Sequence, residues 1–353
     1  MNVTRVLVVG LGAMGLSHAR AYRDLAGFEL AGLCTNRYET RDDLRAEFPG
    51  VPLHGDFREA LAATRPDAVS VNTYTQSHAD YCLAALETGC HVFCEKPLAA
   101  TLADAERVIA AAQAARRQLL IGYILRVHPS WTRFVEIGRT LGKPLVMRMN
   151  LNQQSSGTAW GVHKALMQST SPIVDCGVHY VDIMCQVTGA KPVAVHAVGA
   201  RLTDEITPAM FNYGHLHIAF DDGSVGWYEA GWGPMMSETA FFVKDIIGPK
   251  GCVSIVGAEG GSAEHQGHTR TGALRLHHAG LDANGKFTKP DEILPTAAEP
   301  GHQELCALEQ SLFLAAIRDG RDLSSHHADA LNSLRIVFAA DQSMRGGEVV
   351  RLD

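Results

Sequence analysis

Glu95-Lys96-Pro97 ends the apolar run at residues 91–94 and places a lysine at the end of an expected strand. The proline biases Lys96 toward extended backbone and away from helix. In a parallel sheet the ammonium would then project from the carboxyl edge, where open α/β folds bind ligands. Lys96 is therefore a candidate catalytic residue, with a surface Lys-Pro turn as the alternative for the tripeptide alone. We also expect the Lys96–Pro97 bond to be cis, because cis bonds in proteins occur almost only before proline.

Asp175, His179 and Asp182 form a second group, because they lie four and three residues apart among apolar neighbours. On a helix, residues at these separations share a face. A surface ion pair is one interpretation, but the apolar flanks favour a half-buried face. There the Asp175 carboxylate would orient His179 and bring its pKa toward neutrality.

Glycines 10, 12 and 15 follow a short β-branched run and precede a helical pattern, which gives the spacing G-x-G-x-x-G. In a βαβ unit the first glycine permits a tight turn, the second admits a pyrophosphate, and the third lets helix pack on strand. The N-terminus of the helix then binds the phosphates. We therefore expect a dinucleotide cofactor.

The choice of dinucleotide depends on the end of the second expected strand, Cys34-Thr35-Asn36-Arg37, which has no carboxylate for a ribose hydroxyl. Thr35 and Asn36 can donate to a 2′-phosphate, and Arg37 can pair with it or stack on it. This predicts NADP(H), while NAD(H) is possible if Arg37 only decorates a solvated helix start. The candidate cofactor-binding residues are Gly10, Gly12, Ala13, Met14, Thr35, Asn36, Arg37, Thr73, Tyr74, His78, Glu95 and Lys96.

Lys96 and the Asp175–His179 pair suit hydride transfer to such a cofactor. Hydride leaves a carbinol carbon for nicotinamide only as the hydroxyl loses its proton, so a base of near-neutral pKa and a stabilising cation are required. We assign His179 as the base, Lys96 as the stabilising cation and Asp175 as the residue that orients His179. The sequence does not settle whether Lys96 or His179 is the base.

The elements that must position these residues divide the chain in two. Strand and helix patterns alternate from residue 5 to residue 123, which predicts a doubly wound parallel sheet of the Rossmann type. Later strands follow one another without crossovers, with a hairpin signal at Asp221-Asp222-Gly223, which predicts an α+β domain with a large, mainly antiparallel sheet. We assign residues 1–122 to dinucleotide binding and residues 123–353 to substrate binding and oligomerisation.

Composition narrows the class of partner. The 353 residues carry a formal net charge of −7 with both signs interspersed, which argues against nucleic acid or anionic membranes and favours a small molecule. The eight cysteines are scattered without a Cys-x-x-Cys pair and are expected to be reduced in the cytoplasm. Residues 6–15 are explained by a buried strand and turn rather than a signal peptide, and no stretch approaches the length of a membrane span.

A metal site is not expected. Among the 17 histidines, the pairs His277-His278 and His326-His327 are the obvious places for one. Neither pair has the four-residue helical spacing with an acid that zinc sites use.

Several motifs together resemble the glucose-fructose oxidoreductase, inositol dehydrogenase and MocA (Gfo/Idh/MocA) family over nearly the full length. They are the glycine turn, residues 78–99 with Glu95-Lys96-Pro97, the Asp175-x-x-x-His179-x-x-Asp182 segment and the C-terminal residues 341–347. The resemblance implies that Lys96, Asp175 and His179 match the catalytic set of members that oxidise a secondary ring hydroxyl. It also implies a homodimer or homotetramer formed through the open face of the second sheet.

The substrate pocket departs from the family pattern. Asn72-Thr73-Tyr74-Thr75 replaces the usual Thr-Pro turn after a strand, and only Arg126 remains of an Arg-Arg-Phe run. The expected substrate-binding residues are Lys96, Tyr123, Arg126, Gln153, Trp160, His163, Asp175 and His179, with Lys164 beside them. An aromatic group with several donors suits a sugar ring, and the alternative for each of these residues is a place in a surface loop.

The sequence thus predicts an NAD(P)-dependent oxidoreductase that acts on a secondary alcohol or ketone of a sugar, sugar derivative or cyclitol. One alternative is a dinucleotide-sensing regulatory protein of the same fold, which the presence of Lys96, Asp175 and His179 together argues against. A reductase of a non-sugar substrate, such as a linear tetrapyrrole or a dihydrodiol, is a second alternative that the sequence leaves open.

Overall fold

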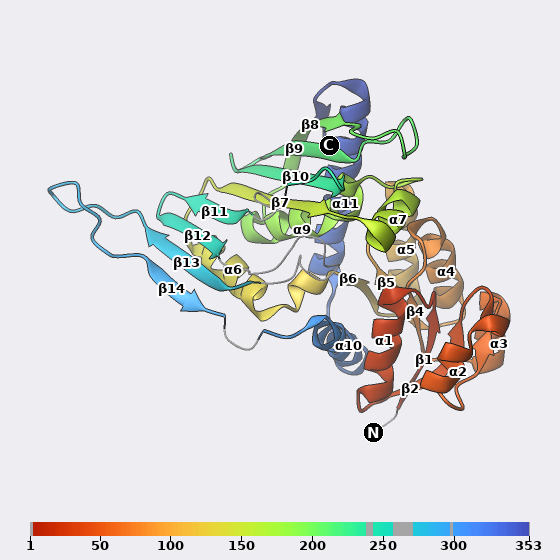
Figure 1. Cartoon of the computed structure of the whole chain (residues 1–353). Helices are drawn as coiled ribbons and strands as arrows, with labels where there is room; N and C mark the ends of the chain where they lie inside the picture. The colour runs from red at the N-terminus through yellow and green to blue at the C-terminus, as the bar shows by residue number, and fades with distance from the viewer. Residues whose placement is uncertain (1–2, 238–242, 257–270, 297–298, 353) are drawn as a thin grey trace. The chain divides into compact units, whose positions relative to one another are not determined.

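The computed structural model describes residues 3–237, 243–256, 271–296 and 299–352 (Figure 1). The chain forms two compact units. Unit 1 comprises Met1–Val127 and Pro300–Leu331, and unit 2 comprises His128–Glu299 and Asn332–Asp353. The predicted domain ranges, 1–122 and 123–353, remain a proposal; the compact units add that residues 300–331 pack with the first part of the chain.

Unit 1 contains a six-stranded sheet in the order β3-β2-β1-β4-β5-β6. The strands are β1 (Thr4–Val9), β2 (Phe28–Cys34), β3 (Leu53–His54), β4 (Ala68–Val71), β5 (His91–Glu95) and β6 (Leu119–Gly122). All neighbouring strands pair in parallel. This order confirms the predicted doubly wound sheet, in which ligands bind beyond the carboxyl ends of the strands.

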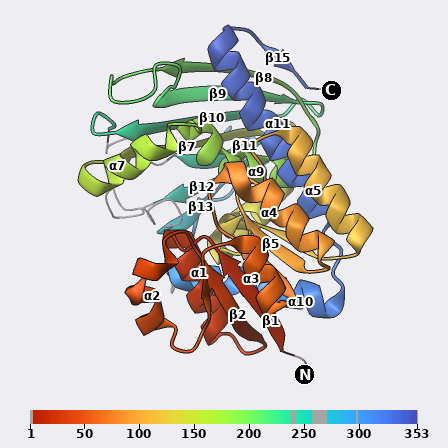
Figure 2. The same cartoon turned by 90° about the vertical axis from the view of Figure 1, so that its right-hand side faces the viewer.

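Helices cover both faces of this sheet, as a parallel sheet requires. They are α1 (Ala13–Asp24), α2 (Asp42–Glu47), α3 (Phe57–Thr64), α4 (Thr75–Glu87), α5 (Leu102–Ala115) and α10 (His302–Asp319), with short 3-10 turns η1 (Tyr38–Thr40) and η2 (Ile124–Arg126). α4 and α5 lie side by side (Figure 2), and α1 packs against α10.

The core of unit 1 depends on the distant helix α10. Tyr22 of α1 meets Phe28 of β2 edge to face at 4.8 Å between ring centroids. Phe313 of α10 lies 6.2 Å from Phe93 of β5 and 6.4 Å from Phe28. Burying these rings supplies the apolar area that holds α10 on the sheet.

Unit 2 contains a nine-stranded sheet within the described residues, in the order β14-β13-β12-β11-β7-β10-β9-β8-β15. The strands are β7 (Val146–Gln154), β8 (Pro192–Ala200), β9 (Tyr213–Phe220), β10 (Val225–Gly233), β11 (Lys244–Gly248), β12 (Gly251–Val256), β13 (Ala273–His278), β14 (Glu292–Pro295) and β15 (Val350–Arg351). The pairings are antiparallel except for that of β7 with β10. The predicted hairpin is confirmed, with Gly223 at φ 81° between β9 and β10.

The helices of unit 2 pack on one face of its sheet. They are α6 (Pro129–Thr140), α7 (Gly157–Leu166), α8 (Pro172–Asp175) and α9 (Gly177–Thr188); the boundary between the units falls within α11 (Ser324–Gly346). α8 and α9 contact β10, and α6 contacts α9, β11 and β12. The predicted loop at residues 257–271 lies, apart from its last residue, outside the described residues.

No helix in the described part of the chain is both long and apolar enough to cross a lipid bilayer.

Candidate active site

The glycine turn of unit 1 connects β1 to α1. Gly10 has φ +84°, and a Cβ there would lie 2.5 Å from the carbonyl oxygen of Asn72. Gly12 caps α1, and a Cβ there would meet no atom within 4 Å. The turn is therefore tight at Gly10 and open at Gly12, beside the N-terminus of α1 that begins at Ala13. This geometry fits a dinucleotide pyrophosphate.

The end of β2 follows the sequence prediction in part. Arg37 lies in the left-handed region at φ 60° and is exposed, just before η1. Arg41 donates to the carbonyl oxygen of Leu11 at 3.3 Å and pairs with Asp43 at 2.8 Å. Arg41 therefore ties the segment after β2 to the glycine turn, and Asp43 offsets its charge.

His78 joins the ends of β4 and β5. Its Nε2 lies 2.9 Å from the carbonyl oxygen of Thr73, and its Nδ1 lies 2.8 Å from that of Pro97. The ring is buried, and burial lowers the pKa of His78. In unit 1 His78 thus braces two strand ends, whereas Tyr74 is exposed at the N-terminus of α4. The predicted cofactor contacts of Thr73, Tyr74 and His78 stay predictions.

Lys96 follows β5 directly, at the carboxyl edge of the same sheet that carries the glycine turn after β1. The Lys96–Pro97 bond is cis, as predicted. Glu95 is buried, and its Oε1 lies 2.7 Å from Nε2 of His18 while its Oε2 accepts from the Lys96 amide at 3.2 Å. Burial raises the pKa of Glu95, but the His18 hydrogen bond and the Lys96 charge outweigh it, so the net pKa is lowered.

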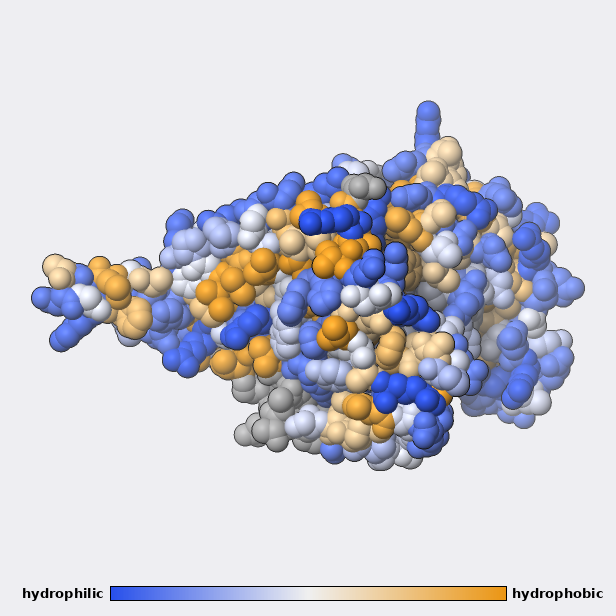
Figure 3. Space-filling view, turned by 90° about the horizontal axis from the view of Figure 1, so that it is seen from above, coloured by the Kyte–Doolittle hydropathy of each residue, from blue (hydrophilic) through white to orange (hydrophobic). Residues whose placement is uncertain are grey.

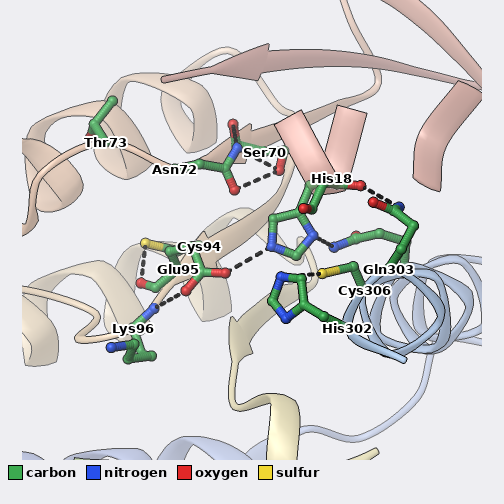
Figure 4. Close-up of polar contacts among 12 residues, drawn as sticks. His18, Ser70, Asn72, Thr73, Cys94, Glu95, Lys96, His302, Gln303 and Cys306 are labelled. Atoms are coloured by element: carbon green, nitrogen blue, oxygen red, sulfur yellow. Dashed lines mark hydrogen bonds and ion pairs between the residues drawn. The ribbon is translucent and has the colours of Figure 1, made fainter. Parts of the chain in front are cut away.

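Figure 4 shows polar groups of α10 beside this carboxylate. Gln310 Nε2 lies 2.9 Å from Nδ1 of His18, and Gln303 donates to the Ser17 carbonyl at 2.8 Å. These bonds join α10 to α1 through side chains that no local pattern in the sequence connects.

Glu309 is a second buried carboxyl group in this region. Burial, and then the charge of Glu95, raise the pKa of Glu309 well above its usual value. Its Oε2 has no hydrogen-bond partner among the described residues. The pKa values of the two carboxyl groups therefore shift in opposite directions, which leaves Glu95 ionised and Glu309 neutral.

Ligating atoms of His18, Cys306 and Glu309 lie within 4.8 Å of one another, a spacing that invites a metal hypothesis. His18, however, already engages Glu95 and Gln310 with its two ring nitrogens. Burial raises the pKa of the Cys306 thiol, which keeps it protonated. An ion here would have to displace Gln310 and remove two protons.

Replacing Glu309 with glutamine should change the pH dependence of stability. The raised pKa means that folded Glu309 holds a proton which the unfolded chain releases above about pH 4.5, so its stabilisation is present below that pH and lost as pH rises toward the folded pKa. Relative to the wild type, Glu309→Gln should gain about 1.4 kcal/mol in free energy of unfolding per pH unit in that window. Urea unfolding of both proteins between pH 5 and 8 measures this, and a constant difference would contradict a neutral Glu309.

The acid–histidine motif of unit 2 departs from the predicted continuous helix. α8 ends at Asp175, and α9 begins at Gly177. Between them the His179 amide donates to the Cys176 carbonyl, three residues earlier. A Cβ on Gly177 would lie 3.1 Å from the Tyr228 ring, so the glycine lets the start of α9 approach β10 closely. His179 and Asp182 are buried, and Asp175 is half-buried.

Two predicted pocket residues of unit 2 come together at the ends of β7 and β10. Gln153 accepts from Nε1 of Trp232 at 2.8 Å and lies 3.8 Å from the Cys176 sulfur. His163 stacks on Trp232, with ring centroids 4.4 Å apart, and its Nδ1 lies 2.9 Å from Ser155 Oγ. Sequence reasoning missed Trp232 and Ser155; the pairing of Trp232 with Gln153 across β10 and β7 places them here.

The remaining predicted pocket residues have structural partners. Trp160 donates to Glu205 at 3.4 Å, and Lys164 pairs with the same carboxylate at 2.7 Å. In unit 1, Arg126 pairs with Asp329 at 3.0 Å, and its guanidinium lies 5.5 Å from the centre of the buried Tyr123 ring. Their contacts with substrate stay predictions.

The histidine pairs have partners other than a metal. His277 and His278 lie 2.7 and 2.5 Å from carboxylate oxygens of Asp291 and Glu292 on the next strand and its approach. His326 accepts from the Ile121 amide, and His327 faces the Leu119 carbonyl, so both bind the backbone of β6.

Two family models match the chain in succession. Residues 4–123 match an oxidoreductase family with an NAD-binding Rossmann fold, and residues 138–261 match the C-terminal domain of that GFO/IDH/MocA family. A parallel sheet with an open glycine turn fits a dinucleotide-binding fold, and the first family model gives the class, oxidoreductases with an NAD-binding Rossmann fold. The chain belongs to the GFO/IDH/MocA family, which confirms the resemblance.

Named relatives span most of the chain. It is 27% identical over 359 aligned residues to scyllo-inositol 2-dehydrogenase (NAD(+)) of Bacillus subtilis (strain 168), covering 99% of this chain and 96% of the relative. It is 26% identical to D-glucoside 3-dehydrogenase of Escherichia coli (strain K12), covering 70% and 75%. The structure of aldose-aldose oxidoreductase from Caulobacter crescentus matches with a TM-score of 0.79 at 23% identity, covering 99% and 100%, which shows the shared fold.

These comparisons support an NAD-binding fold, and they give no support to a preference for NADP(H).

Proposed function

We propose that this oxidoreductase transfers a hydride between a nicotinamide dinucleotide and a secondary alcohol or ketone of a sugar, sugar derivative or cyclitol. The observation that carries the proposal is Lys96 at the carboxyl edge of the sheet whose first strand ends in the open glycine turn. The names of the relatives, which act on inositols and glucosides, support the substrate class.

The proposed roles follow from the chemistry of a carbinol. His179 takes the hydroxyl proton, the Lys96 ammonium stabilises the developing alkoxide, and Asp175 orients the imidazole. The bound dinucleotide supplies the hydride acceptor. The exchange of roles between Lys96 and His179 is the alternative, and the pH profiles of their variants decide between the two.

The sequence and the comparisons point to different dinucleotides. The sequence prediction of NADP(H) rests on Thr35, Asn36 and Arg37, whereas the description of the family and the name of one relative give NAD. Arg37 is exposed after β2, where a 2′-phosphate would lie in this fold.

The test of the proposed function is a fluorescence titration with NADH and NADPH, followed by an absorbance screen at 340 nm across sugars and cyclitols. We expect binding of at least one dinucleotide and turnover of a ring alcohol. NADPH affinity equal to or below that of NADH would overturn the NADP(H) preference. Tight binding without turnover would favour a dinucleotide-sensing protein, and turnover confined to non-sugar carbonyls would favour the other alternative.

We further propose a homodimer or homotetramer in the cytoplasm. On β9, Leu216 and Ile218 are buried toward the helices, whereas His217 between them is exposed on the opposite face. That face also carries Val146, Val198 and Val225 at 40–44% exposure, and such apolar surface favours association. Figure 3 shows further apolar groups on the projecting hairpin of β13 and β14, at the left.

The cytoplasm is supported by the eight cysteines, which all lie in the described residues and are free.

A further inference from the structure

We propose that His18 is a positioning residue for Lys96 and that it acts through the side chain of Glu95. The proposal rests on the proposed function, since it presumes that Lys96 takes part in hydride transfer. It assigns to unit 1 a buried connection that runs from the cofactor helix α1 to the lysine after β5 (Figure 4).

The first step is the way in which Lys96 is held. β5 pairs with β6 up to Glu95, so the Lys96 amide lies just beyond the ladder. This amide donates instead to Glu95 Oε2 at 3.2 Å. On the other side of Lys96, the Pro97 carbonyl meets Nδ1 of His78 at 2.8 Å. The backbone that aims the lysine is thus fixed by two side chains.

The second step is the way in which Glu95 is held. Its other oxygen, Oε1, lies 2.7 Å from Nε2 of the fully buried His18 ring, which also packs on Phe93 with centroids 4.7 Å apart. Gln310 donates from Nε2 to Nδ1 of His18 at 2.9 Å. The His18 proton therefore resides on Nε2 and is donated to Glu95, as in carboxylate–histidine pairs that orient functional groups.

The third step is the position of His18 in the fold. It lies in the first half of α1, the helix whose N-terminus follows the glycine turn. Gln303 of α10 donates to the carbonyl of the neighbouring Ser17 at 2.8 Å and holds this turn of α1 in place. The same rigid helix thus presents the phosphate-binding amides and, through His18 and Glu95, sets the direction of Lys96.

The charges around His18 determine what its loss would do. The titratable groups close to it are Glu95 from the end of β5, and Cys306 and Glu309 from α10; His302 lies 3.6 Å from the Cys306 sulfur. Burial and the Glu95 charge keep Glu309 neutral, so Glu95 is the ionised carboxylate of the group. Without the His18 hydrogen bond, burial would favour protonation of Glu95 at a higher pH.

The experiment compares His18→Leu, which removes both hydrogen bonds, with His18→Gln, whose amide can donate and accept as the neutral imidazole does. With the best ring alcohol of the 340 nm screen, we expect His18→Leu to lower kcat about tenfold or more, because a small misplacement of a catalytic group has large effects. NADH affinity should stay within about twofold, and His18→Gln should recover most of kcat. The acid limb of the kcat profile should move to higher pH in His18→Leu.

Coupling to Lys96 separates positioning from a structural role. The double variant of Lys96→Ala and His18→Leu should be no slower than Lys96→Ala alone, because His18 acts through the missing amine. If Lys96→Ala keeps wild-type kcat, the proposed function fails. If Lys96→Ala loses activity and folded His18→Leu keeps kcat within twofold, or if the two losses multiply, only the positioning proposal is overturned.

Two further measurements cover failure to fold and failure to find a substrate. If His18→Leu does not fold, Glu95→Gln replaces it, since glutamine offers one acceptor oxygen in place of the two that hold His18 and the Lys96 amide; the same loss of kcat and the same non-additivity are expected. Competitive acetylation with acetic anhydride, read by peptide mass spectrometry, needs no substrate. We expect His18→Leu to be acetylated several-fold faster at Lys96 with other lysines unchanged, because a neutral Glu95 no longer favours the ammonium; an unchanged rate would overturn the proposal.

Discussion

Replacing Lys96 with alanine is expected to slow hydride transfer by about 10²-fold or more, because the developing alkoxide loses its stabilising cation. NADH affinity should change little, since the phosphates are held by backbone amides of the glycine turn and α1. Single-turnover absorbance at 340 nm gives the rate, and fluorescence titration gives the affinity. Lys191→Ala, at an exposed lysine of unit 2, is the matched control and should behave as wild type.

His179→Ala should have an effect of similar size, and the comparison assigns the base. The variant that lacks the base should lose the acid limb of the kcat profile and show a rate that rises with hydroxide concentration. Asp175→Asn should shift that limb with a smaller loss of rate, since it removes only the orienting charge. A parallel loss of NADH affinity in Lys96→Ala or His179→Ala would mean that these side chains bind the cofactor and that the proposed roles are wrong.

The sequence predicted the sheet of unit 1 because its signals are local. Short apolar strands such as residues 5–9, the glycine spacing and the alternation with helices each lie within about 30 residues, the length of a βαβ unit. The docking of α10 on this sheet was not predictable in the same way. Phe313 meets Phe28 and Phe93 across more than 200 residues of sequence, and no periodicity connects such distant partners.

The candidate site was predictable to the extent that its residues lie in motifs. Lys96 stands at the end of β5 as expected, and the glycine turn opens α1. The continuous helix predicted through Asp175 and His179 is interrupted at Cys176, where the His179 amide bonds to a carbonyl three residues earlier and Gly177 packs closely on Tyr228. Periodicity reports which face is apolar, but it does not report such a contact with a strand.

Partners behind the site had no signal at all in the sequence. His18 follows the last glycine of the turn by three residues, and in an amphipathic pattern it is one polar residue among others. The proposed role of His18 depends on its hydrogen bonds with Glu95 of β5 and Gln310 of α10. The predicted preference for NADP(H) has a different weakness. It inferred a cofactor from the absence of a carboxylate after the second strand, and the comparisons give that preference no support.

Gly15→Ala and Gly12→Ala are expected to damage the cofactor site in different ways. A Cβ on Gly15 would lie 1.7 Å from the Gly10 carbonyl oxygen, a backbone atom that cannot move without breaking the turn. A Cβ on Gly12 would meet no atom within 4 Å, in the space that we propose for the pyrophosphate. Gly15→Ala should therefore lower both the melting temperature without cofactor and the NADH affinity, whereas Gly12→Ala should lower only the affinity.

The size of the two effects follows from what each methyl group meets. Overpacking against a fixed backbone costs about 1–3 kcal/mol or more, so Gly15→Ala should lower the melting temperature by several degrees. Gly12→Ala should keep that temperature within about 1 °C and weaken NADH binding by about 10²-fold, because losing close approach to the phosphates removes charge-assisted hydrogen bonds. Gly161→Ala, at a glycine of α7 with no atom within 4 Å of its Cβ, is the control for both measurements. Unchanged NADH affinity in Gly12→Ala would show that the dinucleotide binds away from this turn.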